Sequence, residues 1–178
     1  MNAIFSKVNL LASNEDSNFY EMIADIIDHE KVKRLDDYSQ HLNTSRYQHS
    51  INVAYYSFLL AKKMRLNVTE TVRAALLHDF FLYEWRTEQP VKGNHVHVHP
   101  IQALINAKSI TEVTPLMEDV ILSHMWPVGS IRPKSKEAWI VSIADKVCTI
   151  FELGSQLNDR SKKLNLAPML ISLLLLVK

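Results

Sequence analysis

The stretch ALLHDFFLY, residues 75–83, places an adjacent histidine and aspartate, His78 and Asp79, inside an otherwise apolar run. Burying a carboxylate is costly unless it is paired or coordinates a cation, and a buried imidazole must be hydrogen-bonded or bound to metal. Neighbouring helical residues point about 100° apart, so both side chains reach one ion only where the helix directs its end at the site. We therefore expect a helix that ends at this pair, with a hydrogen-bonded core histidine as the alternative.

On both sides of this stretch, apolar residues repeat at gaps of three and four, which is typical of helices with one buried face. A further helix is expected to open near His99 and Pro100, since proline suits a first turn. Other helical segments are expected at 19–27, 51–64, 72–77, 115–125 and 136–153. Only three glycines occur, and no alternation of apolar and polar residues is long enough to indicate a sheet. The sequence therefore predicts an all-α fold.

The 178 residues suit a single domain with additions at its ends. We expect a helical N-terminal extension over 1–45, a core over 46–153, and a linker followed by an apolar C-terminal helix over 154–178. The apolar stretch APMLISLLLLV, residues 167–177, is well short of the roughly 20 residues that span a bilayer. A packing or oligomer helix is therefore favoured there over membrane association, and a homodimer is favoured over a monomer.

The charges of the chain balance, because 20 lysines and arginines stand against 19 aspartates and glutamates, for a formal net charge of +1. Such a chain has no global field to recruit a nucleic acid polymer or an anionic membrane, so an anionic substrate must be held locally. The single Cys148 cannot form an internal disulfide, and the N-terminus lacks the features of a signal peptide. We therefore expect a cytoplasmic protein.

Four histidines, at positions 49, 78, 99 and 124, each lie within or beside an apolar helical segment, so four helices can each present one imidazole. For any one such histidine, a hydrogen bond within the core is the commoner role. Asp145 lies in WIVSIADKVC, another apolar run, where an unpaired carboxylate would be strongly penalised. A salt bridge to a basic neighbour is the alternative to a metal ligand at this position.

Together these features resemble the HD-domain superfamily of metal-dependent phosphohydrolases, through the ordered pattern H…HD…H…H…D. Five segments, over about residues 46–153, each resemble one family helix: RYQHSINVAYYSFLLA, AALLHDF, HPIQAL, ILSHMWP and IVSIADKV. The resemblance implies an HD-domain helical bundle. It also implies one metal ion held by His49, His78, Asp79 and Asp145.

Family members with two additional histidines bind a second ion, so the resemblance implies that His99 and His124 hold one, with Asp79 bridging the pair. The segment NHVHVHP also offers His95 and His97, and His99 is preferred because His-Pro opening a helix is the family form. Imidazole and carboxylate ligands suit Fe, Mn, Zn, Co or Ni better than Mg or Ca. We therefore expect one or two divalent transition metal ions.

The resemblance further implies that a metal-activated water attacks a phosphate ester or anhydride of a small molecule, with a nucleotide as the expected substrate. Asp79 would also orient the nucleophile, and Lys146 is a candidate to contact a phosphate. Four residues are candidates to bind substrate, each with a packing, salt-bridged or solvated role as its alternative. They are Arg46, one turn before His49, Glu84 and Lys92 in the polar connection 84–94, and His95.

Two other functions fit the same residues. A few proteins with the six-ligand pattern are di-iron oxygenases, which consumption of oxygen with an organophosphonate or polyol would reveal. A non-catalytic HD module that binds a nucleotide and regulates a partner is the third hypothesis. Such modules usually lose ligands, and this sequence has lost none of the six.

Overall fold

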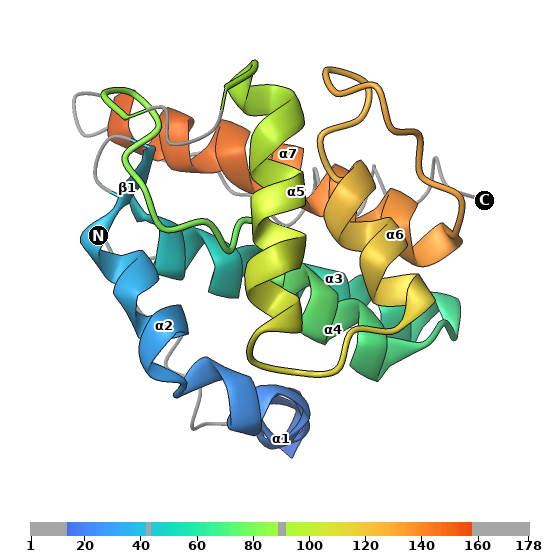
Figure 1. Cartoon of the computed structure of the whole chain (residues 1–178). Coiled ribbons are helices and arrows are strands. Elements are labelled where there is room, and N and C mark those ends of the chain that lie inside the picture. The colour runs from blue at the N-terminus through green and yellow to red at the C-terminus, as the bar shows by residue number, and fades with distance from the viewer. Residues whose placement is uncertain (1–13, 42–43, 89–91, 158–178) are drawn as a thin grey trace.

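The computed structural model describes residues 14–41, 44–88 and 92–157. A bundle of four helices forms its centre: α3 (Arg46–Met64), α4 (Val68–Leu77), α6 (Pro115–Ser123) and α7 (Lys136–Leu157). Helix α3 packs against α4 and α7, and α6 packs against α4 and α7 in turn. Helix α5 (His95–Lys108) crosses the front of this bundle and contacts α6 (Figure 1). The prediction of an all-α fold is confirmed.

The N-terminal part covers one side of the bundle. It consists of α1 (Asn14–Ile27), α2 (Glu30–Lys33) and the 3-10 helix η1 (Arg34–Asp37). The ring of Phe19 on α1 meets those of Tyr55 and Phe58 on α3 edge to face, and Phe19 is completely buried. The helix expected over 19–27 is therefore confirmed, and its apolar stripe packs on the core.

Capping side chains mark where the helices begin. The hydroxyl of Ser45 accepts a hydrogen bond from the Gln48 amide at the start of α3, and the side chain of Asn67 does the same for Glu70 in α4. Thr114 caps α6 directly before a proline at its first position. Such caps satisfy backbone amides that have no partner within the helix.

Two helices end where the sequence places a histidine. Helix α4 ends at Leu77, and His78 keeps helical dihedral angles as its C-cap, so Asp79 follows just beyond the helix. Helix α6 ends in the same way, at Ser123, with His124 as its C-cap. The expectation that the helix ends at the His78–Asp79 pair is confirmed.

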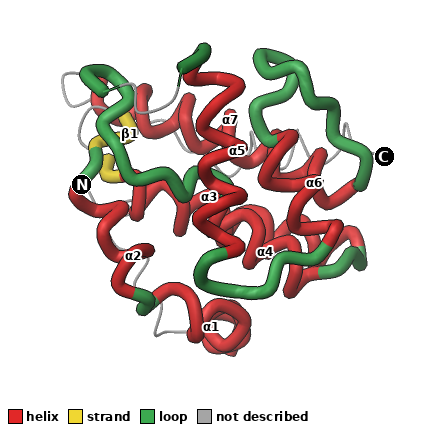
Figure 2. The backbone as a smooth tube through the Cα atoms, in the orientation of Figure 1, coloured by secondary structure: helices red, strands yellow, loops and turns green. Residues whose placement is uncertain are grey.

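The β1–β2 segment and the end of α7 differ from the sequence prediction. A short antiparallel hairpin, β1 (Ser39–His41) with β2 (Thr44–Ser45), precedes α3 (Figure 2). Its strands are too short to show an alternating pattern. Helix α7 continues through Gly154 to Leu157, because one glycine costs a helix only about 1 kcal/mol. The predicted apolar C-terminal helix lies outside the described residues.

Helix α5 begins four residues earlier than expected, at His95. The side chain of Asn94 accepts from the Val96 amide, and its carbonyl accepts from the amides of His97 and Val98. These bonds form a first turn ahead of Pro100, which then lies inside the helix. The expectation that this helix opens near His99 and Pro100 was therefore wrong by one turn, since His95 and His97 occupy its first turn.

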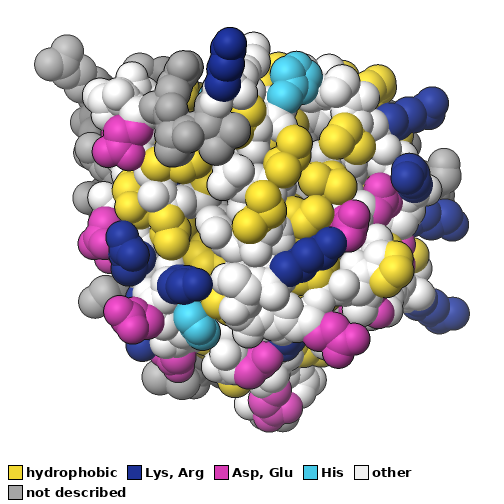
Figure 3. Space-filling view, viewed as in Figure 1, with side chains coloured by type: hydrophobic (Ala, Val, Ile, Leu, Met, Phe, Trp, Pro, Cys, Tyr) yellow, Lys and Arg dark blue, Asp and Glu magenta, His cyan; other side chains and the backbone are white. Residues whose placement is uncertain are grey.

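The surface is mixed in charge. Acidic and basic side chains are interspersed on the face viewed in Figure 3, and apolar side chains gather over its middle. Ile101 and Ile105 on α5 are 47% and 54% exposed. Within the described part of the chain, every helix is too short or too polar to cross a membrane.

Candidate metal centre

Six ionisable side chains converge where α3, α5 and α7 pass the ends of α4 and α6. Each is at most 8% exposed: His49, His78, Asp79, His99, His124 and Asp145. They are the six residues that the sequence analysis proposed as metal ligands, and the structure brings them together. Asp79 lies between two groups of the other residues. Each group, together with one oxygen of Asp79, is called a half-site below.

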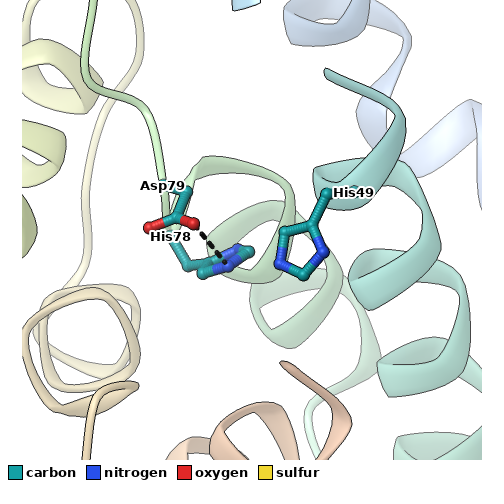
Figure 4. A group of neighbouring side chains, drawn as sticks. All are labelled: His49, His78 and Asp79. Carbon is teal, nitrogen blue, oxygen red and sulfur yellow. Dashed lines mark ion pairs between the residues drawn. The ribbon is translucent and has the colours of Figure 1, made fainter. Parts of the chain in front are cut away.

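Half-site one contains His49, His78, Asp145 and one oxygen of Asp79 (Figure 4 shows the first two histidines with Asp79). Nε2 of His49 lies 3.1 Å from Oδ1 of Asp145, and Nε2 of His78 lies 3.8 Å from the same oxygen. Nε2 of His78 also lies 3.5 Å from Oδ2 of Asp79. Two imidazole nitrogens and two carboxylate oxygens thus face one small volume.

Half-site two contains His99, His124 and the other oxygen of Asp79. Oδ1 of Asp79 lies 3.2 Å from Nε2 of His99 and 3.4 Å from Nε2 of His124. The two imidazole nitrogens are 2.9 Å apart. Because Asp79 offers a different oxygen to each half-site, one carboxylate can serve two ions.

Each of the four imidazole rings is held by a hydrogen bond from Nδ1, the nitrogen that does not face the centre. Nδ1 of His78 donates to the carbonyl of Ala75, Nδ1 of His99 to that of His95, and Nδ1 of His124 to that of Ile121, at 2.7 to 2.8 Å. In His49, Nδ1 donates to Oε2 of Glu152 at 2.9 Å. Since a carbonyl only accepts, the lone pair of neutral His78, His99 and His124 lies on Nε2, and Nε2 of all four rings faces the centre.

The centre is incomplete without a cation. Nε2 of His78 and Oδ1 of Asp79 are buried and have no hydrogen-bond partner. Buried acceptors without a partner are unfavourable, and a divalent ion would satisfy both. The lone pairs of His99 and His124 also face each other, an arrangement that a bound cation would stabilise. The residues therefore fit a metal ion.

Electrostatics favour the same conclusion. Burial alone would raise the pKa of Asp79 and of Asp145, but the imidazoles beside them hold both values well below the usual range. Burial opposes protonation of His49, yet Glu152 and Asp145 outweigh it and raise its pKa to about 10. Both carboxylates are therefore stabilised by positive charge beside them, which a bound cation would supply.

Arg46 reaches the centre indirectly. Its guanidinium is fully buried over the Phe81 ring, 3.5 Å from the ring centroid, and its Nη1 donates to the carbonyl of Phe81 at 2.6 Å. Its Nε donates to Oε1 of Gln40 at 3.1 Å, and Nε2 of Gln40 donates to Oδ2 of Asp79 at 2.5 Å. Arg46 thus braces the segment after the His-Asp pair and positions Asp79 through Gln40.

Lys146 lies beside both half-sites. Its amine donates to the carbonyl of His124 at 2.7 Å and to the carbonyl and hydroxyl of Ser142 at 3.1 Å. It is also 3.7 Å from Oδ2 of Asp145. Burial lowers its pKa, although Asp145 partly offsets this effect. The amine therefore already holds the C-terminal end of α6, next to a ligand.

The remaining candidates to bind substrate are His95, Glu84 and Lys92. The His95 ring stacks between those of His99 and Trp85, with centroids 4.5 Å and 5.0 Å away, and burial lowers its pKa to about 4. The Glu84 carboxylate pairs with Arg86 at 3.3 Å. Lys92 is exposed. Only His95 of these three contacts a predicted ligand.

Two residues of the centre were missed from the sequence. Glu152 lies in an apolar stretch of α7, seven residues after Asp145, so the same signal that identified Asp145 was present there. Residues seven apart lie on one face of a helix. Gln40 gave no signal, because it precedes the first predicted ligand helix and is brought to Asp79 by the β1–β2 hairpin.

Comparison with known proteins agrees with this geometry. The family model for the HD domain matches residues 46–150. Ribonuclease Y of Symbiobacterium thermophilum is 31% identical over 100 residues, which are 56% of this chain and 17% of that protein. The chain thus corresponds to a small part of this relative. No solved structure matches the chain.

Proposed function

This chain belongs to the HD-domain family of metal-dependent hydrolases, and we propose that it is a phosphohydrolase of the six-ligand subgroup. The observation that supports this proposal best is the division of Asp79 between two groups of buried imidazoles. Half-site one would hold one divalent ion through His49, His78, Asp79 and Asp145. Half-site two would hold a second ion through His99, His124 and Asp79, with Fe, Mn, Zn, Co or Ni as the suitable metals.

A bound divalent metal supplies a nucleophile at neutral pH, because it lowers the pKa of its water toward about 7. The protein's own groups would then position the reactants. Asp79, held at Oδ2 by Gln40, would orient that water. Lys146 would contact a substrate phosphate by exchanging one of its bonds at the end of α6. Arg46 would hold Asp79 in place through Gln40, in addition to its predicted role in binding substrate.

We propose a small phosphorylated molecule, most simply a nucleotide, as the substrate. Trp85 is 37% exposed and its ring is stacked on His95, which in turn stacks on His99. This aromatic column leads from the surface to half-site two, and its outer part could contact a nucleobase. Glu84, Lys92 and His95 would contact substrate at this edge. The relative is named as a ribonuclease, so RNA is the competing substrate class.

A hydrolysis screen tests the proposal. The metal-loaded protein is incubated with p-nitrophenyl phosphate, bis-p-nitrophenyl phosphate, nucleoside mono-, di- and triphosphates, and a short oligoribonucleotide. We expect phosphate or nitrophenol release from at least one small substrate, and none from Asp79→Asn. Cleavage of the oligoribonucleotide alone would contradict the small-molecule substrate.

Oxygen consumption, measured in the same samples with an organophosphonate or polyol, separates the oxygenase alternative from hydrolysis. Tight nucleotide binding without turnover would indicate the regulatory module instead. The core boundaries 46–153, the homodimer and the cytoplasmic location remain predictions.

A further inference from the structure

Glu152 is a buried carboxylate that the proposed reaction does not use. It is 2% exposed and lies on α7, two helical turns after Asp145. Its Oε2 accepts from Nδ1 of His49 at 2.9 Å, and its Oε1 accepts from the amide of Asn52 at 2.9 Å. Both partners lie on α3. A buried charge of this kind is costly, so its fixed place between two helices calls for an explanation.

The carboxylate is held rigidly from the outside. The Oδ1 atom of Asn52 accepts from Nε2 of Gln48 at 2.9 Å, so a chain of side chains runs from Gln48 through Asn52 and Glu152 to the His49 ring. On the far side of that ring, Nε2 lies 3.1 Å from Oδ1 of Asp145. The chain thus fixes both the rotation of the imidazole and the nitrogen that faces the centre.

His49 differs in this support from the other three imidazoles. His78, His99 and His124 each donate to a neutral backbone carbonyl within their own helical turn. His49 donates to a full negative charge that comes from another helix, 103 residues away in sequence. A carboxylate behind a ligating imidazole makes the ring a stronger donor to metal and adds attraction for the cation.

We propose that Glu152 is a positioning residue that acts through His49 to raise the metal affinity of half-site one. The inference rests on the proposed function of the centre as a metal site. It assigns to Glu152 no contact with substrate or with the ion. Removing its charge should therefore weaken metal binding at half-site one and leave half-site two unchanged.

Titration of chelator-treated protein with Co²⁺, followed by calorimetry and visible absorption, tests this proposal. Glu152→Gln keeps the length of the side chain and an acceptor oxygen but removes the charge. We expect binding at half-site one, corrected for the protons released in the same titration, to weaken by about 10- to 100-fold, with a changed cobalt spectrum. The matched control is Glu118→Gln, which removes an exposed carboxylate paired with Lys108 on the surface. It should change neither the cobalt affinity nor the spectrum.

Backgrounds that keep one half-site identify where the effect falls. In His124→Ala, which retains half-site one, Glu152→Gln should weaken cobalt binding by the same factor. In His49→Ala, which retains half-site two, it should change nothing. If Glu152→Gln does not fold, Asn52→Ala removes only the outer link and should give a smaller loss at the same half-site.

Three results would overturn the inference. The first is a folded Glu152→Gln protein that binds cobalt like the parent. The second is a Glu152→Gln protein that unfolds at a lower temperature but keeps the parent's affinity and spectrum, because the carboxylate would then be purely structural. In these two cases the parent still binds cobalt, so the proposed function stands. The third is a parent protein that binds no metal, which overturns both this inference and the proposed function.

Discussion

The two half-sites use the same ligand types but are supported differently. Half-site one has two imidazoles and the carboxylate of Asp145 in addition to Asp79, and Glu152 stands behind His49. Half-site two has two imidazoles and Asp79 alone, and backbone carbonyls stand behind both rings. Two ions that shared this aspartate would therefore not be equivalent, since negative charge is concentrated at half-site one.

The largest expected effect comes from the residue that the half-sites share. Asp79→Asn removes the charge from both at once while preserving size, so we expect less than one ion per chain and hydrolysis reduced by more than about 100-fold. Metal analysis and phosphate release measure the two effects. Retention of two ions by a folded Asp79→Asn protein would show that Asp79 is not the bridging ligand.

The next effect separates the two half-sites. His124→Ala should remove the ion of half-site two and leave about one ion per chain, whereas His49→Ala should remove the more tightly held ion. We therefore expect dialysis against a weak chelator to strip His49→Ala more readily than His124→Ala. Equal retention in the two variants would contradict the unequal affinities.

The pH dependence of metal binding should also differ. In the metal-free protein the pKa of His49 is about 10, because Glu152 and Asp145 outweigh the effect of burial, so His49 carries a proton at neutral pH. Burial lowers the pKa of His124, so this ring is neutral at neutral pH. Metal must displace the proton of His49, so affinity at half-site one should rise about tenfold per pH unit from 7 toward 10.

Calorimetry in two buffers with different ionisation enthalpies measures this proton release. The His124→Ala protein, with half-site one, should release at least one proton per ion at pH 7.5. The His49→Ala protein should release fewer. The same low release from both would contradict the assigned difference in charge.

The smallest expected effect concerns the neighbouring histidines of α5. His97 is exposed, whereas Nε2 of His99 lies 3.2 Å from Asp79. His97→Ala should therefore keep the parent's metal content and activity within about twofold, and His99→Ala should lose one ion. Loss of metal in His97→Ala would move the third histidine ligand to that position.

The six candidate ligands could be picked out from the sequence because a buried histidine or aspartate is conspicuous in an apolar run. A histidine or aspartate in an apolar run has few inexpensive roles, and His78–Asp79 at a helix end can direct both side chains to one point. The resemblance to a known family supplied the grouping into two half-sites, which spacing alone does not give.

Other features depend on tertiary contacts that no local pattern records. Gln40 reaches Asp79 only because a short hairpin turns it inward, and the burial of Arg46 depends on Phe81 stacking over its guanidinium. The start of α5 was misplaced because Pro100 was taken as a first-turn residue, whereas the cap of Asn94 forms a complete turn before it. Capping chemistry outweighed the positional preference of proline here.

The number of metal ions per chain decides whether Asp79 joins two metal sites. It is measured by elemental analysis on protein purified without chelator and again after reconstitution. The purification is done both aerobically and anaerobically, with Fe, Mn, Zn, Co and Ni tested in turn. We expect about two ions per chain in the parent protein, and about one in His124→Ala. Protein that is folded yet binds none of these metals would contradict the central claim that Asp79 joins two metal half-sites.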